Sequence, residues 1–470
     1  MYWKKRRVSS ASGRPNVQYA ERILSRGGHT LIDHRANVST RVKARGTVGG
    51  EHLGVCPIMS SSTVVSTVDR SFGTSIHAMP VRFEISSAMS TAEVEAAWLD
   101  LESRASPHFF LSWDWVGCWI EEASLRPAVL IGRVEDRIVL LGAMAPSTRR
   151  DVLPIGIHGL QLHAIGDLQH DIITIEYNGF LVDRDWAGKV EADAIAFLLG
   201  GVVVDGQRRD ELHLRNIPAD LELAVAACGY SFSELQRKPS WRIDLAAVRA
   251  GGKQYLECLS ANTRQQIRRS MRLYERRGPL TAMPAGSVPE ALTFLGGLKE
   301  LHQRYWTARG EPGAFAYPYF ERFQKRLIRT CLPHGTAEIL RISAGPDVIG
   351  YVYNFLYRGH VYAYQSGFHY EYDPRLKPGL VSHCLCIDQH RDAGSTVYDF
   401  MAGDARYKSS LGEPGPDMLY LLAERPTWPL QLESILHGMK RRLNAVRQGL
   451  VRPDASARMS SRGNREPLRD

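Results

Sequence analysis

Residues 349–408 read IGYVYNFLYRGHVYAYQSGFHYEYDPRLKPGLVSHCLCIDQHRDAGSTVYDFMAGDARYK. Two runs of β-branched and aromatic residues flank Arg358-Gly359, which is typical of a β-hairpin. An apolar segment with helical spacing begins at Pro378, and proline suits the first turn of a helix. A further strand is expected at 396–401. The order of strand, helix N-terminus and strand is typical of a binding site for an anionic ligand.

The helix N-terminus at 378–381 is the first candidate binding site. Its backbone N–H groups have no partner inside the helix, and the helix dipole favours an anion such as a pyrophosphate. Polar groups at the end of the next strand can reach whatever that anion carries; they are Asp399, Asp404, Tyr407 and Lys408. On the local pattern alone, an ordinary β-α-β segment with a solvated loop explains these residues equally well.

Charge is distributed unevenly along the 470 residues. Residues 1–80 hold 12 Lys and Arg against 4 Asp and Glu, and residues 437–470 hold 9 against 3. Residues 81–436 hold 38 against 43, so the net charge of +9 comes from the two ends. A body without a basic excess argues against a dedicated nucleic-acid binder, although local basic patches are compatible with this balance.

Seven cysteines are an odd number for a fully paired disulfide framework. The close pair Cys384 and Cys386 lies at i, i+2 of the expected helix, and no second pair completes a zinc site. We therefore expect reduced thiols, no metal site and a cytoplasmic protein. The N-terminal residues have charge without a following apolar segment, and the longest apolar run, 194–204, is too short to span a bilayer. No secretion signal and no membrane span are expected.

Four segments are expected along the chain. Residues 1–78 are rich in Ser, Gly, Arg and Thr, which predicts a disordered basic segment. Residues 79–250 and 251–425 each alternate strand and helix patterns, with Gly251-Gly252 at the boundary. Residues 426–470 indicate a helix and a disordered tail. The predicted fold is therefore α+β, with two units between disordered ends.

The periodicity also predicts the individual elements. In the first unit these are a helix at 91–99 capped by Ser90 or Thr91, a helix at 109–122, a hairpin of 128–133 with 137–145, a strand at 172–177, a helix at 183–199, a strand at 211–214 and a closing strand at 240–245. In the second unit they are helices at 263–277, 289–309 and 318–332, strands at 336–342, 348–356, 360–368, 396–401 and 418–423, and a helix at 426–449.

The expected helix 263–277, capped by Ser260, carries an unusual basic face. Like charges at i, i+4 destabilise a helix, and Arg264, Arg268 and Arg272 accumulate that penalty. Such a helix suits an acidic partner, so these arginines are candidate substrate-binding residues. A solvated basic face, or pairing with the acidic body, explains them as well. Trp306, beside a rigid loop, and Tyr364, on the hairpin, are further candidates for contacting the substrate.

Several chemistries are excluded by missing motifs. The sequence has no Gly-x-Gly-x-x-Gly after a strand, no Walker loop, no His-Glu-x-x-His and no Gly-x-Ser-x-Gly. This argues against nucleotide hydrolysis, metalloproteases and serine hydrolases. Transfer chemistry, in which the protein mainly positions two reactants, remains.

Four motifs carry a resemblance to a known family. They are SANTRQQIRRS at 260–270, QSGF at 365–368, LKPGL at 376–380 and YDFMAGDARYK at 398–408. In this order they resemble the GNAT-type (BioF2-like) acetyltransferase domain of the CelD-like group, which is linked to bacterial cellulose biosynthesis. The resemblance covers about 256–411, and residues 81–245 are similar to the preceding half of the same proteins. The group is also similar to the Fem-type aminoacyl transferases.

The resemblance implies two tandem GNAT-like units with the site in the second one. It implies acetyl-CoA or another acyl-CoA as co-substrate, held by Gln365, Lys377, Gly379, Leu380 and Val381. The sequence departs from the common acyl-CoA signature, Gln/Arg-x-x-Gly-x-Gly/Ala, because Pro378 stands where a glycine is usual. Fem-type enzymes have a similarly altered loop and use an aminoacyl-tRNA donor.

Acyl transfer to an amine assigns roles to the residues after the last strand. The reaction needs a base for the amine proton, donors for the oxyanion and an acid for the leaving thiol. Asp399 or Asp404 is a candidate base, Lys408 can stabilise negative charge, and Tyr407 or Tyr364 can donate to the leaving group. Each carboxylate also fits a structural role as a strand-end or turn cap.

Three functions follow from this sequence. The first is an acyl-CoA-dependent N-acyltransferase that acts on a small-molecule or glycan-precursor amine, linked to exopolysaccharide synthesis. The second is a Fem-type transferase that uses aminoacyl-tRNA, the one case in which nucleic acid would be a partner. The third is a non-catalytic accessory protein of exopolysaccharide assembly.

Overall fold

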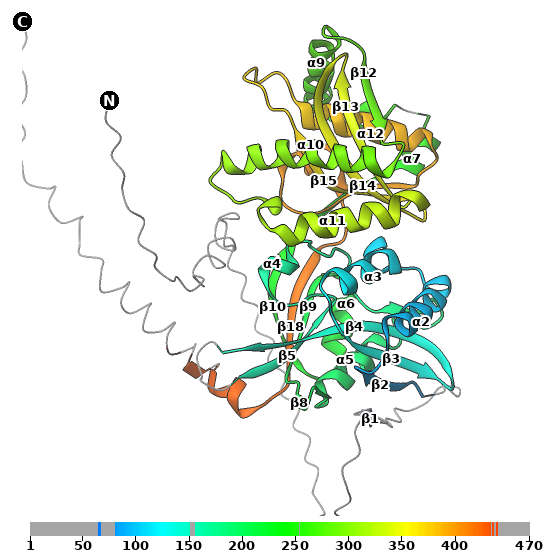
Figure 1. The fold of residues 1–470 in the computed structure, drawn as a ribbon, viewed down its shortest axis with the longest axis vertical. Coiled ribbons are helices and arrows are strands. Elements are labelled where there is room, and N and C mark those ends of the chain that lie inside the picture. Colours follow the sequence, from blue (N-terminus) through cyan, green and yellow to red (C-terminus); the bar gives the residue numbers. More distant parts are fainter. Residues whose placement is uncertain are drawn as a thin grey trace, which may run out of the picture. The chain divides into compact units, whose positions relative to one another are not determined.

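The computed structural model describes residues 64–66, 80–150, 156–252, 254–433, 435–436 and 439. Within them the chain forms two large mixed sheets with helices on their faces, which confirms the α+β prediction (Figure 1). We call them the first sheet and the second sheet.

The first sheet has the order β1-β2-β3-β4-β5-β9-β18-β10, with β6 paired to β4. Its strands are β1 (Val64–Ser66), β2 (Arg82–Ser86), β3 (Ala128–Val134), β4 (Arg137–Arg149), β5 (Ile157–Leu162), β6 (Leu181–Val182), β9 (Glu211–Pro218), β10 (Ser231–Lys238) and β18 (Met418–Glu424). The short strands β7 (Val203–Val204) and β8 (Gln207–Arg208) form a separate hairpin. β5 and β9 run parallel and pair over three residues only, from Gly159↔Glu211 to Gln161↔His213.

The second sheet has the order β12-β13-β14-β15-β16-β11-β17. Its strands are β11 (Ser240–Asp244), β12 (Leu280–Pro284), β13 (Ala337–Ala344), β14 (Asp347–Tyr357), β15 (His360–Phe368), β16 (Val397–Ala402) and β17 (Glu413–Pro414). β14 and β15 form the predicted hairpin, and Arg358 and Gly359 both have positive φ in its turn.

Helices cover both faces of the second sheet. On one face lie α10 (Val288–Thr307) and α11 (Pro318–Cys331), which pack with Ile339 and Tyr353. On the other face, α12 (Pro378–Asp392), α9 (Ala261–Glu275), α8 (Tyr255–Cys258) and α7 (Leu245–Ala250) pack with Leu340 and Val352. Successive residues of β13 and β14 therefore pack into the cores on opposite faces, so the second sheet is buried on both sides.

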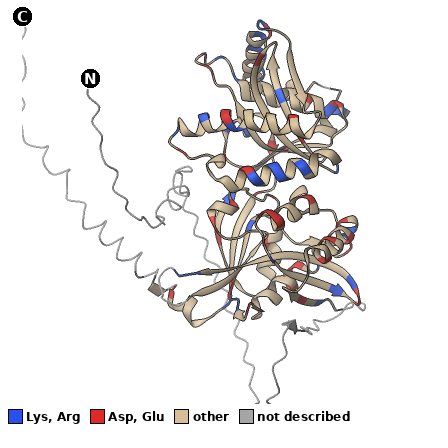
Figure 2. Ribbon diagram, in the orientation of Figure 1, with Lys and Arg blue, Asp and Glu red and all other residues tan. Residues whose placement is uncertain are grey.

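The core around α10 and α11 is continuous with that of the first sheet. It includes Trp98 on α2 (Thr91–Arg104) and Trp115 on α3 (Trp113–Glu122), beside the short helix η1 (Phe109–Leu111). Ion pairs join the same helices, because Arg326 of α11 pairs with Glu121 and Glu122 of α3. Figure 2 shows the distribution of basic and acidic residues along the two halves of the chain. On its opposite face the first sheet packs against α5 (Glu191–Leu199) and α6 (Leu221–Ala227).

The remaining helices are short. They are α4 (Leu168–Asp171), α13 (Arg406–Leu411), η2 (Ala314–Ala316) and η3 (Leu332–His334).

Two strands pair far from their sequence neighbours. β11 follows β10 in the sequence, yet it lies in the second sheet, antiparallel to β16. β18 follows the second sheet in the sequence, yet it lies in the first sheet between β9 and β10. The prediction that 240–245 closes the first unit is therefore wrong, since its partners are on β16 and β17. The limits 79–250 and 251–425 stay a prediction, and these two strands cross them.

Other expectations need correction in detail. Residues 172–177 form no strand, because Thr174 and Tyr177 adopt positive φ, which breaks an extended backbone. The helix expected at 183–199 begins only at Glu191, after Gly188 at φ +76°. Residues 64–66 form β1 rather than a disordered segment. The rest of 1–78 lies outside the described residues. Residues 428–433 are helical as predicted, and the tail lies outside the described part.

The position of β18 predicts its contribution to stability. Leu421 is completely buried in the core of the first sheet, whereas Leu223 on α6 is 76% exposed. Leu421→Ala should lower the free energy of unfolding by about 2–5 kcal/mol, and Leu223→Ala should change it by less than about 0.5 kcal/mol. Urea unfolding measures both, and equal effects of the two variants would contradict the placement of β18 in that core.

Candidate active site

The strands β15 and β16 separate at the position where the sequence analysis placed a site. They pair in parallel from His360↔Val397 to Tyr362↔Asp399, while β15 continues to Phe368 and β16 to Ala402. A bulge on β15 opposite Tyr353 and Asn354 falls just beyond the last pair. Residues between the diverging strand ends are thus reachable from the N-terminus of α12, which follows β15 in the sequence.

Asp399 is at the point of divergence and is 1% exposed. Its carboxylate accepts hydrogen bonds from the Tyr177 hydroxyl and from the Met401 backbone N–H, both at 2.6 Å. Burial raises the pKa of Asp399 to about 6, against the opposing effect of these two bonds. Tyr177 and Met401 both have positive φ, 49° and 59°, and such strained residues often occur at functional sites.

Two histidines complete the surroundings of Asp399. His108 Nδ1 lies 2.8 Å from the Tyr362 hydroxyl, and the His108 ring stacks on Tyr177 with centroids 4.1 Å apart. His360 Nε2 is buried 3.9 Å from Asp399 Oδ2 and has no hydrogen-bond partner among the described residues. Burial lowers the pKa of each histidine to about 4, so both rings are neutral at pH 7.

Lys408 and Glu176 form the charged side of the same region. Lys408 Nζ donates to the Ala402 carbonyl at 2.6 Å, and burial lowers the pKa of this lysine. The negative charges of Glu176, Asp399 and Asp404 oppose that shift. Burial raises the pKa of Glu176 to about 7, and its Oε2 has no partner among the described residues. We call Glu176, Tyr177, Asp399 and Lys408, with His108, His360 and Tyr362, the junction cluster.

The predicted pyrophosphate site lies at the start of α12. Lys377 is the N-cap and makes no side-chain bond to the helix, while its backbone N–H donates to Ser270 Oγ at 2.9 Å. The N–H groups of Gly379 and Leu380 precede the first helical hydrogen bond, so they face a ligand or solvent. Val381 is completely buried, so only its backbone could contact a cofactor.

Aromatic rings occupy the space beside this helix end. A Cβ on Gly379 would lie 3.1 Å from the Phe368 ring. Phe368 also contacts His383, which stacks on Tyr407 with centroids 5.3 Å apart. The Phe368 ring therefore packs against α12 on the side where a side chain at position 379 would lie. Gln365 lies nearby on β15, where its Oε1 accepts from the Ser366 N–H.

The predicted substrate-binding residues lie in three separate places. Arg264, Arg268 and Arg272 line one hollow of ≈ 450 Å³ along α9. Trp306 is 38% exposed at the end of α10, beside Tyr305. Tyr364 is used within the protein, because its hydroxyl donates to the Ile173 carbonyl and accepts from Gln324 Nε2. Their roles in substrate binding stay predictions.

Of the predicted catalytic residues, the structure brings Asp399 and Lys408 together. Asp404 is exposed near them, and Tyr407 lies apart, stacked on His383. The sequence did not identify five members of the junction cluster: Glu176, Tyr177, His108, His360 and Tyr362. His360 and Tyr362 lie on β15, the strand that was singled out, so they could have been found. The other three come from loops of the first half, and nothing in their local pattern marks them.

Part of the chain is similar to a known protein family. Residues 261–409 match the family described as "Acetyltransferase (GNAT) domain". No curated protein matches the chain. Among solved structures, that of FemX is similar at 10% identity, covering 73% of this chain and 98% of that one, with a TM-score of 0.49. A tandem GNAT protein from the clavulanic acid biosynthesis pathway is similar at 13% identity, covering 73% and 98%, with a TM-score of 0.38.

The matched domain contains α9, β15, α12 and β16, which is the part that holds the diverging strands. The fold is thus α+β, and residues 261–409 match a GNAT-type acetyltransferase domain, which supports an acyltransferase. The tandem arrangement of two GNAT-like units stays a prediction. None of the described helices is long and apolar enough to cross a membrane. The described residues hold no group of His, Cys, Asp and Glu side chains arranged for a metal ion.

The raised pKa of Glu176 predicts a pH-dependent stability. Its pKa is 4.5 ordinarily and about 7 here, so the folded state binds more protons than the unfolded state between these values. The contribution of Glu176 to stability therefore falls as pH rises from about 4.5 to about 7, by about 3 kcal/mol. Glu176→Gln should gain stability relative to the wild type by that amount between pH 4.5 and pH 8 in denaturant titrations. A difference that is constant with pH would show that Glu176 titrates normally.

Proposed function

We propose that this protein is an acyl-CoA-dependent N-acyltransferase whose reaction takes place at the junction cluster. One observation carries the proposal: the parallel strands β15 and β16 separate at Tyr362 and Asp399, and the uncapped N-terminus of α12 follows β15. A thioester arm lying between the separated strands would present its acyl group to Asp399 while its pyrophosphate meets the helix N-terminus.

The junction cluster supplies the groups that aminolysis of a thioester needs. The amine nitrogen attacks the thioester carbonyl carbon, a C–N bond forms, and the C–S bond breaks. Asp399, ionised at neutral pH with its pKa about 6, accepts the amine proton. Asp399 then returns this proton, directly or through solvent, to the departing thiolate to give free CoA, and Lys408 stabilises negative charge as it develops. Both residues are buried enough for such interactions to be stronger than in water.

Donor binding is tested at Lys377. Lys377→Ala removes one charge-assisted contact to the pyrophosphate and should weaken CoA binding by about ten- to a hundredfold, with no change in melting temperature. Lys189→Ala is the matched control, because Lys189 is exposed in the first half and bonds only to the Asp185 carbonyl among the described residues. Isothermal titration of CoA into the three proteins measures this. Equal affinities in all three would place the donor elsewhere.

A second candidate donor is aminoacyl-tRNA. It is favoured by the arginine-lined hollow on α9, whose positive charge suits a nucleic acid. In that case CoA would not bind, whereas tRNA would bind with an affinity that falls steeply with salt concentration. The same titrations, repeated with tRNA at two salt concentrations, separate the two donors.

The base is tested by exchanging two carboxylates. Asp399→Asn should lower kcat about 10²- to 10⁴-fold with little change in the KM for acetyl-CoA, because it removes the proton acceptor and not the donor site. Asp404→Asn is the control, since Asp404 is exposed. CoA release with a panel of primary amines gives both constants. Loss of activity in Asp404→Asn alone would make Asp404 the base instead.

The acceptor class and cellular setting rest on the sequence resemblance. We propose a small-molecule or glycan-precursor amine as acceptor, an association with cellulose or exopolysaccharide synthesis, and a cytoplasmic location. Acyl analysis of metabolites and polysaccharide from cells with and without the gene tests the association.

A further inference from the structure

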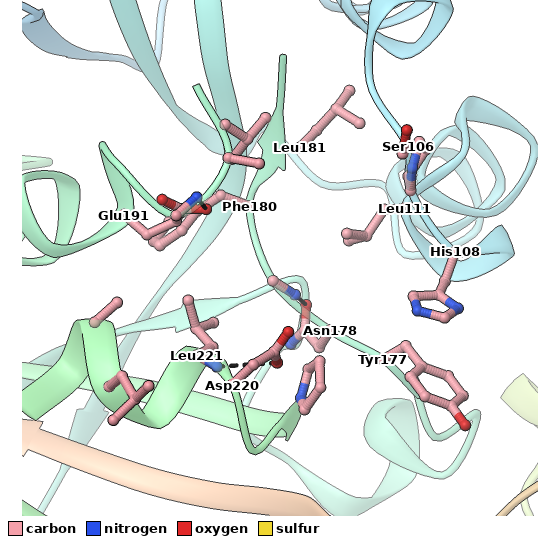
Figure 3. Close-up of a pocket in the computed structure, with 18 of the residues that line it drawn as sticks. Ser106, His108, Leu111, Tyr177, Asn178, Phe180, Leu181, Glu191, Asp220 and Leu221 are labelled. Atoms are coloured by element: carbon pink, nitrogen blue, oxygen red, sulfur yellow. Dashed lines mark hydrogen bonds between the residues drawn. The ribbon is translucent and has the colours of Figure 1, made fainter. Parts of the chain in front are cut away.

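A cavity of ≈ 720 Å³ lies in the first half of the chain, between η1, the segment 177–192 and α6 (Figure 3). Pockets of this size commonly enclose one small molecule. Most of its lining is apolar, contributed by residues such as Leu111, Phe180, Leu181, Leu221 and Ala224. The walls are therefore suited to a hydrocarbon body rather than to a sugar, whose hydroxyl groups would need polar partners.

One wall of this cavity is shared with the junction cluster. His108 and Tyr177 both line it, and Figure 3 shows their rings side by side at the wall opposite Glu191. Beyond that wall, His108 Nδ1 contacts Tyr362 and the Tyr177 hydroxyl donates to Asp399. The Tyr177 ring thus separates the cavity from the carboxylate that we assign as the base, so acyl transfer to a molecule in the cavity requires that ring to move.

The charged groups of the lining favour a cation. Glu191 and Asp220 carry negative charge, and neither forms an ion pair with a described basic side chain. Arg184 also lines the cavity, and its Nε donates to the Arg104 carbonyl, so the lining carries two negative charges against one positive charge. The cavity is not suited to a pyrophosphate, because the Glu191 carboxylate already accepts the Gly188 and Val190 N–H groups at the start of α5. Its lining is thus the reverse of what CoA phosphates require.

We propose that this cavity binds the acceptor, a primary amine with an apolar body. Asp220 attracts the amine end, while the hydrocarbon part packs on Leu181 and Leu221. The assignment of this molecule as acceptor rests on the proposed function, but its binding does not, because binding needs no donor. Of the two acceptor classes proposed above, the apolar cavity favours the small-molecule amine over the glycan precursor.

Calorimetric titration of the full chain with n-hexylamine, n-hexanoate and glucosamine tests the proposal. We expect n-hexylamine to bind and the other two to bind at least about tenfold more weakly. Ala224→Trp fills the cavity and should abolish n-hexylamine binding. Ala226→Trp is the matched control, since Ala226 is exposed on the same helix and outside the lining, and it should bind as the wild type does. Melting temperatures show that both variants fold.

Charge is tested separately from shape. Asp220→Asn keeps an N-cap for α6, because asparagine caps a helix as well as aspartate, but it removes a negative charge. It should weaken n-hexylamine binding several-fold and leave the affinity for n-hexanol unchanged. Equal binding of n-hexanoate or glucosamine, or n-hexylamine binding that survives Ala224→Trp, would overturn the proposal. Neither result would affect CoA binding at α12, which is measured independently.

Discussion

Strand β11 follows the first half in sequence but joins the second sheet, and β18 follows the second sheet but joins the first. This exchange determines which residues surround Asp399. β11 pairs with β16, and this ladder puts Arg242 directly opposite Asp399. The positive charge of Arg242 contributes to lowering the pKa of His108 and of His360. β18, in turn, adds Leu419 and Leu421 to the core of the first sheet. Each half of the chain thus completes the other, so that the loop with Glu176 and Tyr177 reaches the end of β16.

Each half contains a short parallel strand pair and a helix between the two strands in sequence, and the halves differ at the N-terminus of that helix. In each, a parallel pair separates after three residues, β5 from β9 and β15 from β16. In the first half, the longer helix between β5 and β9 is α5, and the Glu191 carboxylate at its start accepts from the Gly188 and Val190 N–H groups, which disfavours an anion there. In the second half, Lys377 leaves the N-terminus of α12 uncapped by a side chain. The start of α12 has N–H groups without a side-chain cap, which favours the donor site in the second half. The start of α5 already carries a carboxylate, which is compatible with the acceptor site in the first half.

Local pattern was enough to predict what lies within short sequence distances. The hairpin around Arg358-Gly359, the start of α12 at Pro378 and the Ser260 cap of α9 follow from turn and capping chemistry, and all three are observed. Asp399 and Lys408 were identified because they close a strand within the same motif. The rest depends on long-range pairing. The residue pattern of β11 does not indicate which sheet it joins. The segment around Glu176 has the residue pattern of a strand, although Thr174 and Tyr177 adopt positive φ.

A crystal structure of the protein with CoA would show directly whether the donor binds at the N-terminus of α12 and between β15 and β16. We expect the pyrophosphate at the N–H groups of Gly379 and Leu380 and the thiol between β15 and β16 near Asp399. CoA bound in the cavity between η1 and α6 would contradict this placement.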